Sequence, residues 1–207
     1  MLLMVVVFAV DATRKNAHLR KINKKNNYSS FHKRMANSTE EKVKMVRKLV
    51  RECKAVALSA NSAISGFEGY TDVILQIPAD GGRGIPYLYI SPKEVSGLDL
   101  SKDYKASLLY SQSAIDDSCD NYPLKAKDSK CAKAMLIGKI TKVYEDDEDY
   151  QFGYDAIIEK VPGYADVDKE EFELLKMIIE GIFLRSEDGS PDQLSVDAYI
   201  NAASNPN

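Results

Sequence analysis

The chain has 207 residues, of which 44% are hydrophobic and 29% charged, a composition typical of a globular protein and unlike that of a collagen, a coiled coil or a disordered chain. At roughly 100–200 residues per domain, this length predicts one domain with appendages. The formal net charge is −3, so the chain as a whole is no polyanion binder. The two histidines, His18 and His32, precede the first strong secondary-structure pattern. The predicted domain therefore lacks the histidine that Ser-His-Asp and Cys-His catalysis require, and also the commonest zinc ligand.

The first residues form an apolar run, MLLMVVVFAV, that is too short to cross a bilayer, which takes about 20 apolar residues. Its length and the triplet Val10-Asp11-Ala12 are typical of a signal peptide with its cleavage site, although no Lys or Arg precedes the run. An edge strand is the alternative. Because a polar, basic stretch follows rather than a turn and a partner strand, we interpret residues 1–12 as a signal peptide. This interpretation predicts a secreted protein without a membrane span.

A basic arm at residues 13–37 precedes an acidic domain at residues 38–207. Between residues 13 and 54 there are 14 Lys or Arg and 3 Asp or Glu, a local charge of +11, whereas the rest of the chain carries −14. The arm is interpreted either as a solvated leader or as a polyanion-binding segment acting through Arg14 to Arg34. Few aromatic side chains are interleaved with these cations, which disfavours binding to nucleic acid.

Two sequons and two cysteines fit an exported protein. Asn27 and Asn37 each begin an N-x-[S/T] triplet, so N-glycans are predicted at both. Cys119 and Cys131 bracket a polar segment without apolar periodicity, and we predict that they form a disulfide, which would contribute about 3 kcal/mol. Cys53 ends an amphipathic pattern and is predicted to be a buried thiol.

The elements are predicted from apolar periodicity and turn residues. Ser38 and Glu41 have the spacing of a capping box, and the apolar spacing after them predicts a helix that ends at Cys53. Gly138 predicts a bend or bulge in its strand. Residues 172–184 fit a helix by composition and a strand by alternation, and the residues alone leave both open. The remaining pattern predicts strands at 54–60, 70–78, 85–91, 106–112 and 132–144, a glycine-rich turn at 79–84, and helices from Ser91-Pro92 toward Asp103, from the acidic run 145–149 toward Pro162, and at 195–200.

Several segments resemble those of known proteins in their order and spacing. Residues 47–59 resemble the opening of the split-barrel flavoproteins related to pyridoxamine 5′-phosphate oxidase. Residues 84–92, GIPYLYISP, resemble a stretch of the CREG family, the secreted "cellular repressor" glycoproteins. Further segments follow in the order of that family: 106–108, Cys119 and Cys131, 137–143, 188–191 and 195–201. The resemblance covers roughly residues 41–201.

This resemblance implies a mainly β fold with short helices, a six-stranded antiparallel split β-barrel of the FMN-binding type, in which residues 172–184 form a strand. It also implies a homodimer, secretory or endolysosomal passage, N-glycans and no established catalysis. The leading hypothesis is therefore a non-catalytic secreted or endolysosomal glycoprotein that acts through protein–protein contacts with a receptor or other partner that the sequence does not identify. The alternative is an FMN-dependent oxidoreductase. The long, Lys-rich arm departs from the family, so its sequons need not match the family's glycan positions.

The residues that would bind a flavin phosphate are not evident in the chain. Split-barrel oxidases pair the phosphate with Arg or Lys and Ser or Thr on barrel strands, but this chain has Asp72 where such a cation is sought, and a carboxylate repels phosphate. Arg83 lies in a turn and Lys105 at a strand start, and either is more often a solvated cation than an anion ligand. We therefore predict no FMN binding, and we assign no catalytic, cofactor-binding or metal-binding residue.

The strands carry more apolar faces than one small barrel buries, which predicts an isologous homodimer. The alternative is that the two predicted helices ending near residues 53 and 160 cover these faces. Tyr87 and Tyr89 share one face of their strand. Such a pair of tyrosines more often packs in the core or at a dimer interface than in a cofactor site. The apolar positions are Ile74, Leu75 and Ile77 on one strand, Leu88 and Ile90 on the next, and Met135, Leu136 and Ile137 on a third.

Overall fold

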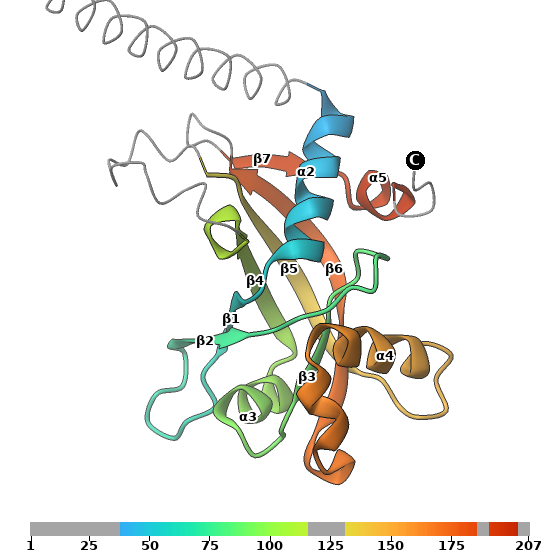
Figure 1. Ribbon diagram of the computed structural model, residues 1–207. Helices are drawn as coiled ribbons and strands as arrows, with labels where there is room; N and C mark the ends of the chain where they lie inside the picture. Colours follow the sequence, from blue (N-terminus) through green and yellow to red (C-terminus); the bar gives the residue numbers. More distant parts are fainter. Residues whose placement is uncertain (1–37, 116–130, 186–190, 203–207) are drawn as a thin grey trace, which may run out of the picture. The chain divides into compact units, whose positions relative to one another are not determined.

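The structure is a computed structural model that describes residues 38–115, 131–185 and 191–202 (Figure 1). The chain divides into two compact units, residues 1–41 and residues 42–207, and the second contains the sheet. The helices are α2 (Thr39–Glu52), α3 (Val95–Lys102), α4 (Tyr150–Lys160) and α5 (Val196–Asn201), with short 3₁₀ turns η1 (Gln112–Ala114), η3 (Pro162–Asp166) and η4 (Lys169–Glu171). The strands are β1 (Val56–Asn61), β2 (Thr71–Gln76), β3 (Tyr87–Ile90), β4 (Lys105–Ser111), β5 (Lys133–Lys142), β6 (Glu173–Arg185) and β7 (Pro191–Leu194).

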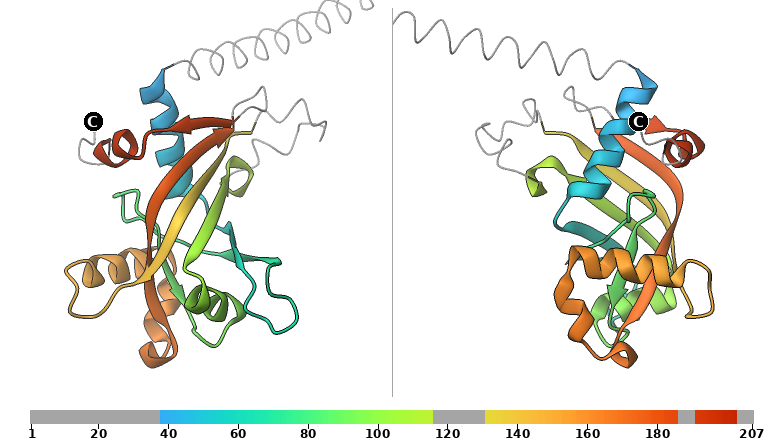
Figure 2. Two further views of the ribbon diagram at one scale, coloured as in Figure 1. Left: turned by 180° about the vertical axis from the view of Figure 1, so that it is seen from behind. Right: turned by 45° about the vertical axis from the view of Figure 1, so that its right-hand side comes forward.

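All strands of the described residues belong to one antiparallel sheet in the order β2-β1-β4-β5-β6-β3, with β7 paired to the end of β6. The sheet curls around α2 as a half-barrel (Figure 2). The predicted mainly β split-barrel architecture is thus confirmed. The sequence pattern missed β7, because its four residues, PDQL, are mostly polar and begin with a proline.

Strand β6 resolves the segment whose residue pattern fitted both helix and strand. Its Glu, Leu and Lys residues suit a helix, but its 13 residues pair with β5, β3 and β7. Tertiary pairing overrides the weak local preference here. The predicted irregularity in β5 is also confirmed, since the register between β5 and β6 shifts between Ile137 and Gly138. A Cβ atom on Gly138 would overlap the backbone carbonyl of Ile178, so this bulge requires glycine.

The core lies on both sides of β3. On the concave side, buried side chains of α2 pack against the inward row of the sheet, among them Val46 and Leu49 against Leu58 and Leu136. On the other side, α4 covers a second cluster built around Tyr87, Tyr89, Val143, Ile157 and Leu174. Each fully buried aliphatic side chain stabilises the fold by about 1.5–3 kcal/mol relative to an exposed one.

The helix starts are partly as predicted. Ser38 and Glu41 exchange backbone-to-side-chain hydrogen bonds, so the capping box before α2 is confirmed. Helix α3 begins at Val95, and the prediction that Pro92 occupies its first position is wrong, because residues 91–94 form a separate turn closed by the bond from Glu94 N to Ser91 O. Helix α4 likewise begins after the acidic run, whose residues form turns.

Candidate interaction face

The outer face of the sheet carries an uninterrupted apolar row. Direct cross-strand pairs place Leu75 beside Ala57, Ala57 beside Leu109, and Leu109 beside Met135. Met135 in turn pairs with Phe183, so the row crosses five strands. Leu75 is 76% exposed, Leu109 43% and Met135 37%. The neighbouring row, in the same order of strands, is Val73, Ser59, Ser107, Ile137 and Gly181.

The inward residues of the same strands are covered by the chain itself. Leu58, Leu108 and Leu136 are fully buried under α2 and its neighbours. Leu88 and Ile90 are also fully buried, so the prediction that β3 offers an open apolar face is wrong. The open face comes from β2, β1, β4 and β5 instead. It has the composition of an association surface, because its exposed apolar side chains are contiguous across neighbouring strands.

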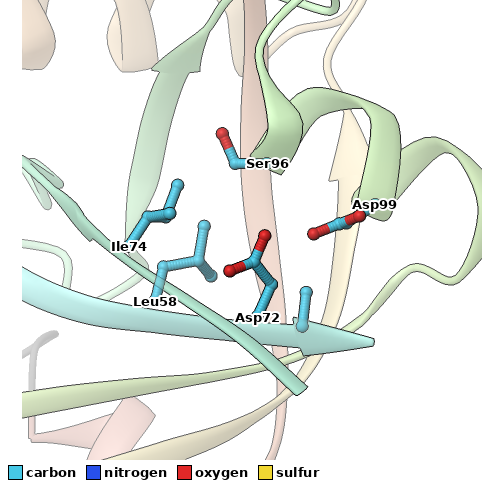
Figure 3. A pocket seen from close by; sticks show the side chains of 6 residues that line it. Leu58, Asp72, Ile74, Ser96 and Asp99 are labelled. Atoms are coloured by element: carbon cyan, nitrogen blue, oxygen red, sulfur yellow. The ribbon is translucent and has the colours of Figure 1, made fainter. Parts of the chain in front are cut away.

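A shallow depression on the other side of β2 is lined by Asp72, the residue at which the sequence analysis looks for a phosphate-binding cation (Figure 3). It encloses almost no volume (about 0 Å³), against the roughly 300–1,000 Å³ of ligand sites. The carboxylates of Asp72 on β2 and Asp99 on α3 point toward one another across it. Leu58, Ala60, Ile74 and Ser96 complete the lining, which includes no cationic side chain. These residues do not fit a flavin phosphate, because two carboxylates would repel it.

Asp99 also has a structural role at this place. It is almost fully buried, and its Oδ1 accepts a hydrogen bond of 2.6 Å from Ala63 N. Lys102 Nζ donates to Ala63 O, so two residues of α3 hold the hairpin between β1 and β2. The carboxylate thus satisfies a backbone donor of the hairpin, and it does not need a bound ligand to explain its burial.

The two candidate cations of the sequence do not reach this depression. Arg83 lies over the ring of Phe152, with its guanidinium carbon 3.4 Å from the ring centroid. Its Nη1 is 3.4 Å from Asp149 Oδ1, and the other oxygen of Asp149 accepts from Lys176 Nζ at 2.7 Å. Lys105 is exposed at the start of β4. The structure therefore brings neither Arg83 nor Lys105 together with Asp72.

Tyr87 and Tyr89 belong to the core, which confirms the interpretation of their shared face. Both are buried under α4, and Tyr89 stacks on Phe172 with ring centroids 5.1 Å apart. Desolvation raises the pKa of Tyr89 to about 12. Cys53 is a buried thiol as predicted; its Sγ donates to Ser111 O, and burial raises its pKa.

The other sequence predictions concern residues that the structure does not describe. The signal peptide at 1–12, the arm at 13–37 and the sequons at Asn27 and Asn37 lie outside the described residues, and so does Cys119, the predicted partner of Cys131. Within residues 38–115, 131–185 and 191–202, no three His, Cys, Asp or Glu side chains gather as a metal site requires. No helix of these segments is long and apolar enough to span a membrane.

Solved structures similar to this one share its fold at low sequence identity. A heme binding protein from Mycobacterium smegmatis matches 79% of this chain and 60% of its own, with a TM-score of 0.61 and 17% identity. A protein from Clostridium acetobutylicum related to general stress protein 26 of B. subtilis, of the pyridoxinephosphate oxidase family, matches 77% of this chain and 98% of its own, with a TM-score of 0.53 and 18% identity. At these identities the likeness shows the fold alone.

Sequence relatives agree with the resemblance drawn from single motifs. Human Protein CREG2 is 28% identical over 126 residues, which are 60% of this chain and 42% of the relative. Protein CREG1 of Gallus gallus is 32% identical over 110 residues, 50% of this chain and 57% of the relative. The matched part thus spans about half the length of these relatives. The model of the family described as "CREG, beta-barrel" matches residues 37–201, and the chain therefore belongs to the CREG β-barrel family.

Proposed function

We propose that the chain is a non-catalytic secreted or endolysosomal glycoprotein that acts through protein–protein contacts, the first of which is with a second copy of itself. The observation that carries this proposal is the open apolar row of Leu75, Leu109 and Met135 on the sheet. A two-fold axis over this face would cover the row with the same row of the partner. A stable interface of this kind buries more than about 1,000 Å² in total.

Light scattering of the purified chain at micromolar concentration tests the dimer. The expected mass is twice that of one chain, which is 23.1 kDa before any loss of the first residues or addition of glycans. Leu109→Lys places a charge at the centre of the row and is expected to give the single-chain mass, because an unpaired charge in an apolar interface costs several kcal/mol. Tyr144→Lys is the matched control, since Tyr144 is an exposed residue after β5 and away from the row. A single-chain mass for the unmodified protein would refute the dimer.

Export makes a second, separable prediction. Intact mass of the protein secreted from cells is expected to show loss of the first residues, N-glycans at Asn37 and Asn27, and no free thiol at Cys119 and Cys131. Glycosidase treatment that leaves the mobility unchanged contradicts the glycans, and two free thiols in non-reduced protein contradict the disulfide. This measurement does not depend on the oligomeric state.

An FMN-dependent oxidoreductase is the second candidate function, because the fold is shared with a protein of the pyridoxinephosphate oxidase family. The acidic lining at Asp72 and Asp99 opposes it. Absorbance of the purified protein and titration with FMN decide between the two. We expect a colourless protein without stoichiometric binding, and a dissociation constant below the micromolar range would reverse the assignment.

A further inference from the structure

The turn between β2 and β3 is built so that helices approach its backbone closely. Residues 80–84, DGGRG, contain three glycines, each with a positive φ, between +51° and +83°. A Cβ atom on Gly81 would lie 3.0 Å or less from the ring of Phe152 on α4, and one on Gly82 would lie 3.6 Å from Arg51 Nη2 on α2. In Figure 1 this green connection extends toward α2 and α4. Close contact with α4 thus requires glycine at Gly81, and the positive φ favours glycine at all three positions.

Two arginines of α2 lie against this turn, and a lysine of α4 lies beside the second of them. Arg47 Nη2, on α2, donates a hydrogen bond to Gly82 O. Arg51 lies one turn further along α2, with its guanidinium beside Gly82. Lys160, at the end of α4, donates from Nζ to Arg51 O at 3.3 Å.

The acidic side chains near the turn do not balance these charges. Asp80 is the carboxylate of the turn itself; it is buried, its Oδ2 accepts from Gly84 N at 2.9 Å, and its charge acts on Lys160. Glu52 on α2 pairs with Lys48. Glu159 precedes Lys160 on α4, and within the described residues it forms no ion pair with the turn. In the segments that the structure describes, neither Arg51 nor Lys160 has a carboxylate within ion-pair distance.

Several donors at the turn are also left without acceptors. Nη1 of Arg47 is buried and makes no hydrogen bond within the described part of the chain. Within the described residues the backbone N–H groups of Gly81 and Gly82 make no hydrogen bond, whereas those of Arg83 and Gly84 donate to Asp80. Burial lowers the pKa of Lys160, and the charge of Asp80 offsets this effect only in part.

We propose that the Gly81–Gly82 turn, with Arg51 and Lys160, is a binding site for a tetrahedral oxyanion, the phosphate or sulfate group of a larger ligand. Guanidinium, ammonium and successive turn amides are the donors that such anions bind, and Arg51 supplies a planar fork for two oxygens. Arg51 and Gly81 are exposed, so the anion reaches them from solvent. Arg47 acts from behind, where it fixes the turn and adds positive potential. The site is distinct from the depression at Asp72 and does not depend on the dimer.

The test is an amide NMR titration of the full chain with inorganic phosphate, in which chloride is exchanged to keep the ionic strength constant. Saturable shifts of the Gly81 and Gly82 amides are expected. Arg51→Gln is expected to weaken the apparent affinity about fivefold or more, as loss of a charge-assisted contact does, and Lys160→Gln to weaken it similarly. Lys105→Gln, which removes an exposed charge on β4, is expected to change it less than about twofold, as a distant screened charge would.

Two further arms complete the test. Arg51→Lys keeps the charge but removes the planar fork, so its affinity is expected to lie between those of the unmodified chain and Arg51→Gln. Because Arg51 is exposed, these two Arg51 variants are informative even if Lys160→Gln does not fold. Parallel titrations with sulfate and with a phosphate monoester show which group the site prefers. Shifts that do not saturate, or that Lys105→Gln reduces as much as Arg51→Gln does, would overturn the proposal.

Discussion

Replacing Gly84 by alanine tests whether the glycine turn is held by close packing or by backbone geometry alone. Gly84 has φ +79°, and a Cβ atom there would overlap Nη1 of Arg47 and lie 3.0 Å from the hydroxyl of Tyr199. Neither neighbour is free to move. Arg47 is 8% exposed and is fixed to Gly82 O, whereas the Tyr199 hydroxyl donates to Gly84 O at 2.9 Å.

The expected destabilisation has two parts. A left-handed conformation costs an alanine roughly 1–2 kcal/mol. Displacing a buried guanidinium and breaking the Tyr199 bond leaves buried polar groups unsatisfied, which costs about 1–3 kcal/mol more. Gly66→Ala is the matched control, because Gly66 has φ +85° and nothing within 4 Å of its Cβ position. The difference between the two variants therefore isolates the packing part, about 2 kcal/mol.

Urea denaturation at one protein concentration measures this difference, since the stability of a dimer depends on concentration. With a slope of about 2 kcal/mol per molar urea, the midpoint of Gly84→Ala is expected about 1 M below that of Gly66→Ala. Equal midpoints would show that Arg47 and Tyr199 adjust without cost, and the packing argument for the turn would be wrong.

Three further predictions concern single groups. The neutral, buried Tyr89 contributes stability that is present below pH 10, where the unfolded phenol begins to ionise, and that is lost as the pH rises toward about 12. Tyr89→Phe is expected to reduce this alkaline loss of stability in denaturation curves, and an unchanged pH profile would contradict the prediction. Asp99→Ala is expected to cost about 2–3 kcal/mol and to speed hydrogen exchange at the Ala63 amide, and unchanged exchange would show that the carboxylate does not hold the hairpin. The added methyl group of Gly138→Ala would meet a rigid backbone carbonyl of β6, so this variant is expected to lose about 2–4 kcal/mol of stability in thermal unfolding. Gly163→Ala, whose Cβ position is open, is the control and is expected to lose almost none. Similar losses would refute the steric reason for glycine at the bulge.

The elements that the sequence predicts best are those with local causes. The capping box at Ser38 and the bulge at Gly138 each depend on a few neighbouring residues, and both are found. Strand β6 is the opposite case, because its residues suit a helix and only pairing with three other strands makes it a strand. The family resemblance, rather than propensity, decided that segment correctly.

The candidate site depends on information that no single segment carries. Alternation along β2 indicates that Leu75 and Ile74 face opposite ways, but not which of the two is covered. The apolar row becomes visible only when the registers of β2, β1, β4 and β5 are combined. The proposed oxyanion site is even harder to predict from the sequence, because Arg51 and Lys160 are more than 100 residues apart in the chain.

The two edges of the sheet differ in a way that locates the proposed contact. At one edge, β3 is apolar at all four positions, and both of its faces are buried, the leucine and isoleucine under the main core and the tyrosines under α4. At the other edge, β2 is exposed at every second residue, and within the described residues no strand lies beyond it. An exposed edge with apolar side chains is a template for pairing with another chain. Because the apolar row starts at Leu75 on this same strand, the open face and the open edge meet at β2, and self-association is expected to begin there and not at β3.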